Sequence, residues 1–288
     1  MVLIKMPVSE RNKNMQELKI IKTTLDIGLG RALRFIHLTD MHLAFDDEGD
    51  ERGRFRYFEN STELFEKICE YAKEKDLFML NTGDFLDFLS KKNLEHADRS
   101  LLPTNTIYAA GNHDFCHFVG RATEDYEYKW EQIKVSAPHL PNNLYFYSRI
   151  IDGVNFVTLD DSYYRFTIGQ MELLRAEAAR GYPIILGLHV PIFTKAQADS
   201  ILAEGHKTAY MIGAPKEYTD RYPNDRSALQ IPDEITMTVA EYIKSEPMIK
   251  AVFAGHTHIS FEELLDGRLP QITTDGAFKG VIREVTLI

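Results

Sequence analysis

Five short, largely apolar segments, each followed at once by polar residues, constrain the fold of this chain more than any other feature. They are residues 33–39, 77–80, 106–110, 184–188 and 249–254. Segments of this length and composition predict strands, and stretches with helical periodicity lie between several of them. Fully apolar strands separated by helices predict a sheet that is buried on both faces, because helices cover it from either side.

The helices are predicted from apolar residues that recur on one face. In residues 61–74, the side chains of Leu64, Phe65, Ile68 and Tyr71 fall on a single stripe, which is typical of a helix packed against a sheet. The other predicted helices cover residues at about 123–134, 168–179 and 234–245.

Further strands near both ends of the chain predict a second sheet. Residues 17–26 and 33–39 are interpreted as a hairpin around Gly28 and Gly30. A second hairpin is predicted around Asp152-Gly153, a pair that tolerates positive φ. Its strands are residues 144–151 and 154–159, and the closing strands are residues 259–265, 269–273 and 281–287. We therefore predict an α/β fold with four layers, a two-sheet β-sandwich flanked by helices.

The chain is predicted to form one domain, residues 1–288. It contains no repeat, low-complexity tract or linker rich in Pro, Gly and Ser, and 288 residues are enough to bury a sizeable core. The irregular segment 205–232 is long for a compact domain, which is typical of a functional loop. Because it lies between two of the polar clusters described below, we interpret it as a lid or insert that faces the substrate.

Composition excludes some classes of partner. The formal net charge of −10 disfavours binding to nucleic acid or anionic lipid, although bound divalent cations would still let the chain accept a phosphate substrate. Two distant cysteines, Cys69 and Cys116, fit a reducing compartment. The apolar start is too short for a signal peptide, and no stretch approaches the roughly 18 apolar residues of a membrane span. These observations predict a cytoplasmic protein.

The polar residues that follow the five apolar segments are candidate ligands of a metal centre. In open α/β sheets the functional crevice lies outside the carboxyl ends of the strands, so residues distant in sequence are expected to converge there. Carboxylates, imidazoles and one amide, without a thiolate, suit Mn, Fe or Zn in a mixed N/O site rather than a structural zinc. The residues are Asp40 and His42, Asp84, Asn112 with His113 and Asp114, His189, and His256 with His258.

The last of these clusters is the most specific. An apolar strand ends at Gly255, and two histidines follow, separated by one residue. A strand followed by a tight turn would direct His256 and His258 into one open space. Two imidazoles aimed at adjacent metal ions require that arrangement, whereas unliganded histidines do not.

Taken in order, the motifs DMH, GD, GNHD, GLH and GHTH between residues 40 and 258 resemble those of the calcineurin-like metallophosphoesterase family. The resemblance implies a two-sheet sandwich that holds two metal ions and uses a bridging hydroxide to attack the phosphorus. It implies Asp40, His42 and His258 as ligands of the first ion, with Asn112, His189 and His256 as ligands of the second. Asp84 would bridge both ions. His113 would protonate the leaving oxygen or donate to the phosphoryl oxygens, and Asp114 would orient its ring.

Each of these residues also has an ordinary structural interpretation. A lone Asp after a strand is usually a helix cap, as Asp84 would be in isolation, and Asn112 alone would be a turn residue. The sequence leaves open whether Asp87 supports a ligand or only begins a helix, and His117 is unassigned. Tyr163, Tyr164 and Arg165 follow a strand and belong to a solvated loop or contact the substrate. The histidines outside the motifs are interpreted as structural or exposed: His37, His96, His139 and His206.

The leading functional hypothesis is a phosphodiesterase that hydrolyses a small, nucleotide-like ester. A phosphomonoesterase, such as a protein phosphatase or nucleotidase, fits the same metal motifs. A non-catalytic scaffold that keeps the fold is the alternative from another class, and it predicts eroded ligands. A nuclease is disfavoured by the acidic balance. The sequence makes no prediction of oligomeric state.

Overall fold

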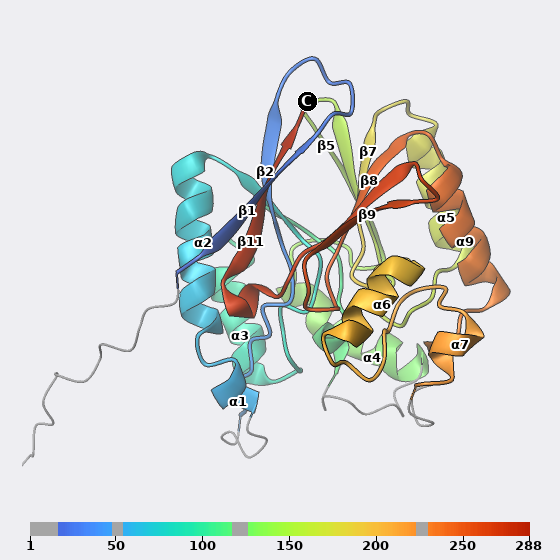
Figure 1. Ribbon diagram of the computed structural model, residues 1–288. Coiled ribbons are helices and arrows are strands. Elements are labelled where there is room, and N and C mark those ends of the chain that lie inside the picture. Colours follow the sequence, from blue (N-terminus) through green and yellow to red (C-terminus); the bar gives the residue numbers. More distant parts are fainter. Residues whose placement is uncertain (1–16, 48–53, 117–125, 223–229) are drawn as a thin grey trace, which may run out of the picture.

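Two sheets face each other at the centre of the computed structural model, which describes residues 17–47, 54–116, 126–222 and 230–288 (Figure 1). The first sheet has the strand order β1-β11-β2-β3-β4. Its strands are β1 (Lys19–Leu25), β11 (Val281–Leu287), β2 (Leu33–Leu38), β3 (Phe78–Asn81) and β4 (Thr106–Tyr108). β2, β3 and β4 run parallel, so their carboxyl ends meet at one edge of the sandwich.

The second sheet has the order β5-β6-β7-β8-β10-β9. β6, β7, β8 and β10 run parallel, while β5 and β9 are antiparallel edge strands. Both sheets are therefore mixed. The strands are β5 (Phe146–Ile151), β6 (Val154–Leu159), β7 (Ile184–Gly187), β8 (Ile249–Ala254), β9 (Phe261–Leu265) and β10 (Leu269–Thr273).

One predicted hairpin is confirmed and the other is wrong. β5 and β6 pair through Asp152 and Gly153, both at positive φ. β1 and β2 do not pair, because β11 lies between them, parallel to β1 and antiparallel to β2. The residues between β1 and β2 are numerous enough to cross over a strand, and the apolar β11 is better suited than β1 to a buried central position.

Helices cover the outer face of each sheet, which gives the predicted four layers (Figure 1). α2 (Ser61–Lys75) and α3 (Lys91–Ser100) lie outside the first sheet, and α5 (Ile168–Ala178) and α9 (Glu234–Ser245) lie outside the second. The side chains of Asp233 and Thr167 cap the first turns of α9 and α5. No helix in the described ranges is both long and apolar enough to cross a bilayer.

Shorter helices gather near the end of the sandwich where β2 and β3 finish (Figure 1). α6 was not predicted from the sequence, and the predicted helix at 123–134 begins in residues outside the described part. These elements are α1 (Arg54–Tyr57), α4 (Tyr126–Ser136), α6 (Lys195–Ala203) and α7 (Lys216–Thr219), with the 3-10 turns η1 (His113–Phe115), η2 (Ala137–His139) and η3 (Ala277–Lys279).

Alternation along the strands divides the core into layers. In β2, Leu33 and Phe35 face the second sheet, whereas Ile36 and Leu38 pack with the predicted apolar stripe of α2. Between the sheets, the Phe35 ring meets those of Phe156 and Phe253 edge-on at centroid distances of 5.2 and 5.4 Å. Because side chains fill both sides of each sheet, the strand ends are held rigidly and can position functional groups.

Candidate metal centre

The predicted ligand residues converge at the carboxyl ends of β2, β3, β4, β7 and β8. Carboxylate oxygens and imidazole nitrogens form three groups, and the atoms within each group lie within 4.8 Å of one another. His42 and Asp84 each belong to two groups, so the three groups form one continuous cluster. The groups are Asp40, His42 and His258; His42, Asp84 and His113; and Asp84, His189 and His256.

Nitrogen and oxygen atoms of the cluster lie close to one another. The Nε2 atoms of His42 and His258 are 3.1 Å apart, and His258 Nε2 is 3.0 Å from Asp40 Oδ1. On the other side of the cluster, His189 Nε2 lies 3.2 Å from Asp84 Oδ2 and 3.1 Å from the amide oxygen of Asn112. The Asn112 amide is thus brought to the same point as the charged groups.

Two of the imidazoles are held by their second nitrogen. His42 Nδ1 donates to the Asp87 carboxylate at 2.9 Å, and His189 Nδ1 donates to the backbone carbonyl of Thr82 at 2.7 Å. A neutral ring that donates through Nδ1 carries its lone pair on Nε2, the atom that faces the cluster. Such supporting bonds are the usual companions of histidine ligands.

The backbone at these positions is strained. Asp40, His42, Asp84, His256 and His258 all have φ between 52° and 65°. Residues other than glycine rarely adopt this left-handed conformation, which costs of order 1–3 kcal/mol each and tends to occur at functional sites. Here all five of these residues belong to the cluster.

Two glycines of the motifs are required because a side chain at their positions would clash with neighbouring atoms. A Cβ at Gly111 would lie 2.1 Å from Asp84 Oδ1, and a Cβ at Gly255 would lie 1.8 Å from Thr39 Oγ1 and 2.5 Å from Asp40 Oδ2. Gly111 and Gly255 therefore let one strand end approach the carboxylate of another. This explains why GNHD and GHTH begin with glycine.

Burial and charge oppose each other at the two supported imidazoles. Burial alone would lower the pKa of His42, but hydrogen bonds to Asp40 and Asp87 raise it to about 10. Burial would also lower the pKa of His189, but the negative charge of nearby Asp84 raises it to about 10. The surrounding carboxylates thus create a field that favours positive charge, whether carried by protons or by metal cations.

The carboxylates respond in the opposite direction. Burial would raise the pKa of Asp84, but the positive charges of His189 and His113 hold it below its ordinary range. Burial is also outweighed at Asp40, where His258 lowers the pKa well below the usual value. Both carboxylates are therefore ionised at neutral pH and available as ligands.

His113 lies at the open side of the cluster. Its Nδ1 donates to the backbone carbonyl of Asp87 at 2.9 Å, and its Nε2 is 4.0 Å from Asp84 Oδ2. Its backbone N–H donates to Asp84 Oδ1 at 2.8 Å. The side chain is 17% exposed, whereas those of His42 and His189 are 1% and 0% exposed, so a substrate can reach its ring more easily.

The prediction that Asp114 orients the His113 ring is wrong. The Asp114 carboxylate accepts hydrogen bonds from the Tyr108 hydroxyl and from three backbone N–H groups, those of Asp84, Leu86 and Gly111. These bonds join the loop after β3 to the loop after β4, whereas the His113 ring contacts Asp87. Burial, together with the charge of Asp84, raises the pKa of Asp114 to about 6.

Asp87 instead takes the orienting position. Its fully buried carboxylate accepts from His42, lies 3.3 Å from His113 Nδ1, and forms an ion pair with Arg54. Burial would raise the pKa of Asp87, but its bond to Arg54 keeps it well below the ordinary range. Of the two interpretations open from the sequence, support of a ligand is the one the contacts favour.

Two residues of the loop after β6 also reach the cluster. The Asp161 carboxylate accepts from the backbone N–H groups of His189 and Val190, at 2.9 Å each. The Tyr164 hydroxyl lies 3.2 Å from His256 Nε2, and Tyr164 has a φ of 62°. The sequence placed Tyr164 in a solvated loop or in contact with the substrate, without predicting a contact with a candidate ligand, and it did not signal Asp161.

The histidines outside the motifs lie elsewhere, as predicted. Buried His37 bridges the hydroxyls of Thr82 and Thr274 at 2.9 and 2.8 Å, His96 stacks on Phe45, and His139 pairs with Asp98. His206 is exposed. His117 lies outside the described residues.

The donor set fits metal cations. The Nε2 atoms of His42 and His258 face each other. If both neutral rings carry their lone pair on Nε2, they cannot form a hydrogen bond with each other, because neither atom has a proton to donate. A cation accepts both lone pairs and also neutralises the ionised Asp40 and Asp84. The cluster combines carboxylate, imidazole and amide donors, a set that suits Mn, Fe or Zn.

Comparison with solved structures finds chains of similar length that share this arrangement to different degrees. A dimetal phosphatase from Danio rerio matches with 14% identity and a TM-score of 0.52, over 86% of this chain and 88% of that chain. A phosphopantetheinyl hydrolase from Mycobacterium tuberculosis matches with 10% identity and a TM-score of 0.43, over 89% of this chain and 91% of that one. An archaeal phosphodiesterase has 14% identity and a TM-score of 0.35, over 85% and 84%.

The comparison with the Danio rerio protein shows the two-sheet fold. No curated protein matches the chain. The sequence model of the calcineurin-like phosphoesterase family matches residues 33–260, which include every strand-end cluster described above. The chain belongs to the calcineurin-like phosphoesterase family.

Proposed function

We propose that this chain is a metal-dependent phosphodiesterase that hydrolyses a small, nucleotide-like phosphodiester. The observation that carries the proposal is the cluster in which Asp84 belongs to two groups of candidate ligands, one containing His42 and the other containing His189 and His256. A carboxylate in that position can serve two cations with its two oxygens.

The proposed ligands follow the three groups of atoms. Asp40, His42 and His258 would hold one ion, and Asn112, His189 and His256 the other, with Asp84 between them. The 3.0 Å contact of His258 with Asp40 and the 3.1 Å contact of Asn112 with His189 support this division. The mixed N/O donors suit Mn, Fe or Zn.

Two cations bound there would neutralise the anionic ester and activate water for in-line attack. The remaining chemistry falls to the protein. His113 Nδ1 donates to the Asp87 carbonyl, and its Nε2 lies 4.0 Å from Asp84 Oδ2. From there Nε2 would protonate the leaving oxygen or donate to a phosphoryl oxygen of a bound ester. Asp87 acts as a positioning residue because it contacts both His42 and His113.

The substrate is proposed to be small. The net charge of −10 opposes a long polyanion, so nucleic acid is disfavoured, while bound cations would attract a single phosphate. We further propose that the chain forms one domain and that segment 205–232 faces the substrate. The proposed location is the cytoplasm. Residues 223–229 of that segment lie outside the described part.

The test is hydrolysis of bis(4-nitrophenyl) phosphate by the purified protein with Mn²⁺. His113→Ala is expected to lower kcat by about 10²–10⁴-fold, the usual contribution of a positioned acid. Asp84→Ala is expected to abolish turnover and to lower the metal content. His139→Ala is the matched control, because its ring pairs with Asp98 on the surface. Full activity in both cluster variants would refute the proposal.

A phosphomonoesterase is the nearest alternative, and the metal ligands do not separate the two. Kinetics on 4-nitrophenyl phosphate and on the diester, measured side by side, discriminate between them by the ratio of kcat/KM values. A non-catalytic scaffold is disfavoured by the complete donor set. Metal analysis tests it, since a scaffold is expected to bind no transition metal at neutral pH.

A further inference from the structure

A pocket of about 600 Å³ lies between α7 and α9, lined by residues within 213–222 and 231–237. Ligand pockets in proteins commonly have volumes of roughly 300–1,000 Å³. α7 lies near the end of the sandwich that carries the metal-centre residues (Figure 1). The lining residues are Gly213, Ala214, Pro215, Lys216, Thr219, Asp220, Tyr222, Ile231, Pro232 and Met237.

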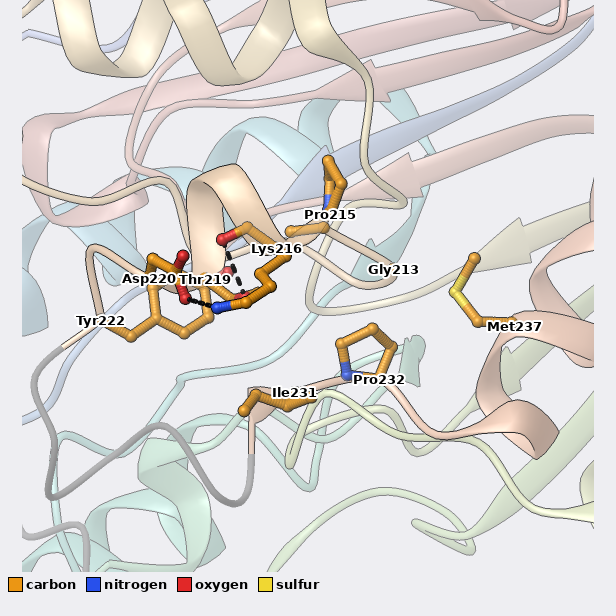
Figure 2. A pocket seen from close by; sticks show the side chains of 10 residues that line it. Gly213, Pro215, Lys216, Thr219, Asp220, Tyr222, Ile231, Pro232 and Met237 are labelled. Atoms are coloured by element: carbon orange, nitrogen blue, oxygen red, sulfur yellow. Dashed lines mark hydrogen bonds and ion pairs between the residues drawn. The ribbon is translucent and has the colours of Figure 1, made fainter.

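The walls of this pocket are mainly apolar. Pro215 and Lys216 lie on one side and Ile231 and Pro232 on the other, with Met237 of α9 near one end (Figure 2). Ile231 and Met237 are 46% and 37% exposed, which is high for large apolar side chains. Rigid apolar faces around an open space suit a flat, uncharged group.

The polar groups of the lining bond to one another or to the backbone. Lys216 forms an ion pair with Asp220, so the two charges cancel. The Thr219 hydroxyl donates to the Lys216 carbonyl at 3.3 Å, and the Tyr222 hydroxyl donates to the Ala209 carbonyl at 3.1 Å. Tyr222 therefore presents its ring rather than its hydroxyl, and the pocket is poorly suited to a second phosphate.

A series of aromatic contacts connects the pocket to the metal centre. The rings of His256 and Tyr164 are 5.4 Å apart, those of Tyr164 and Tyr210 are 6.3 Å apart, and those of Tyr210 and Tyr222 are 4.7 Å apart. Arg165, next to Tyr164, donates to the Ile231 carbonyl at 3.3 Å. The loop that contacts a candidate ligand thus also holds the pocket wall.

We propose that this pocket binds the flat, uncharged part of the substrate, of the nucleobase class, while the phosphate lies at the metal centre. The proposal rests on the proposed function, because it assigns the pocket to the same substrate. Apolar contact with Ile231, Pro232 and Met237 would supply affinity, and Tyr222 would offer an aromatic face.

The experiment compares two ligands that differ only in the base. Isothermal titration calorimetry measures the Kd of adenosine 5′-monophosphate and of ribose 5-phosphate for the Mn²⁺-loaded protein. We expect the nucleotide to bind about tenfold more tightly, equivalent to about 1.4 kcal/mol. Ile231→Asn and Met237→Gln add no charge and remove apolar contact, so together they are expected to remove this difference. Leu264→Gln on β9, at a residue 54% exposed, is the control and should leave the ratio intact.

Equal affinity of the two ligands for the unmodified protein would overturn the proposal. An equal loss for both ligands in the pocket variants, or an unchanged ratio, would also overturn it. Thermal melting of each single variant guards against misfolding. The proposed function is tested separately, because diester hydrolysis by the same preparation does not enter the binding ratio. A protein that hydrolyses the diester but shows no base preference would retain its function without this pocket assignment.

Discussion

The Nε2 atoms of His42 and His258 lie 3.1 Å apart, with Asp40 Oδ1 3.0 Å from the second of them. This arrangement brings two lone pairs and a negative charge to one point. His258→Ala is therefore expected to lower the number of tightly bound metal ions by roughly one per chain while the other site remains occupied. Elemental analysis after gel filtration measures this directly. An unchanged metal content would remove His258 from the ligand set.

Asp87 and Asp114 are expected to differ in what they support. Asp87→Asn weakens the bonds to His42 and Arg54, so we expect the kcat of the folded protein to fall by about 10–100-fold. Asp114→Asn replaces an acceptor of four hydrogen bonds and should mainly destabilise the fold, by about 1–3 kcal/mol. Kinetics and urea unfolding of both variants separate the two roles. The reverse pattern would restore the sequence-based assignment of Asp114.

Tyr164→Phe removes a hydroxyl that lies 3.2 Å from His256 Nε2 and leaves the ring contacts in place. Because a partner on one ring nitrogen orients a ligand, we expect the affinity of one metal site to fall by about tenfold. Competition with a chelator of known affinity measures the change. Tyr210→Phe serves as the control, because the Tyr210 ring contacts Tyr164 and, among the described contacts, not His256. Identical metal affinities in the two variants would argue against a positioning role for Tyr164.

The metal-free protein is expected to become less stable as pH rises. The pKa of both His42 and His189 is raised in the folded state from 6.5 to about 10, so protonation stabilises the fold fully below pH 6.5. That contribution is lost as pH rises through about 10. Urea unfolding of chelated protein should give a lower free energy of unfolding at pH 9 than at pH 6, by a few kcal/mol. Metal-loaded protein should show a smaller decrease, and equal stability of the chelated protein at both pH values would contradict the prediction.

Much of the architecture could be predicted from local pattern. The apolar strands between helices indicated a covered sheet, and the further strands near both ends of the chain indicated a second one. The turn at Asp152-Gly153 identified the β5–β6 hairpin. The position of β11 between β1 and β2 could not be predicted, because pairing between distant strands depends on how complete surfaces fit together. α6 was missed because its short sequence carries little helical periodicity.

The candidate site was predictable in its residues and not in its supporting contacts. Each strand end is marked by a polar residue after an apolar run, so the residues that converge could be named individually. Asp114 was assigned to His113 because the two are adjacent in sequence, yet successive side chains of the η1 turn point in different directions. Asp87 was left open between two interpretations and Asp161 was not signalled, because both act through hydrogen bonds across loops that local pattern does not determine.

The central place of β11 has a consequence for biosynthesis. Arg34 of β2 forms an ion pair with Glu284 of β11, 250 residues further along the chain. A ribosome therefore releases nearly all of the second sheet before the strand that completes the first becomes available. Until then β1 lacks its neighbour and β2 has an open edge, which is where a chaperone or an aggregating partner would attach to the nascent polypeptide.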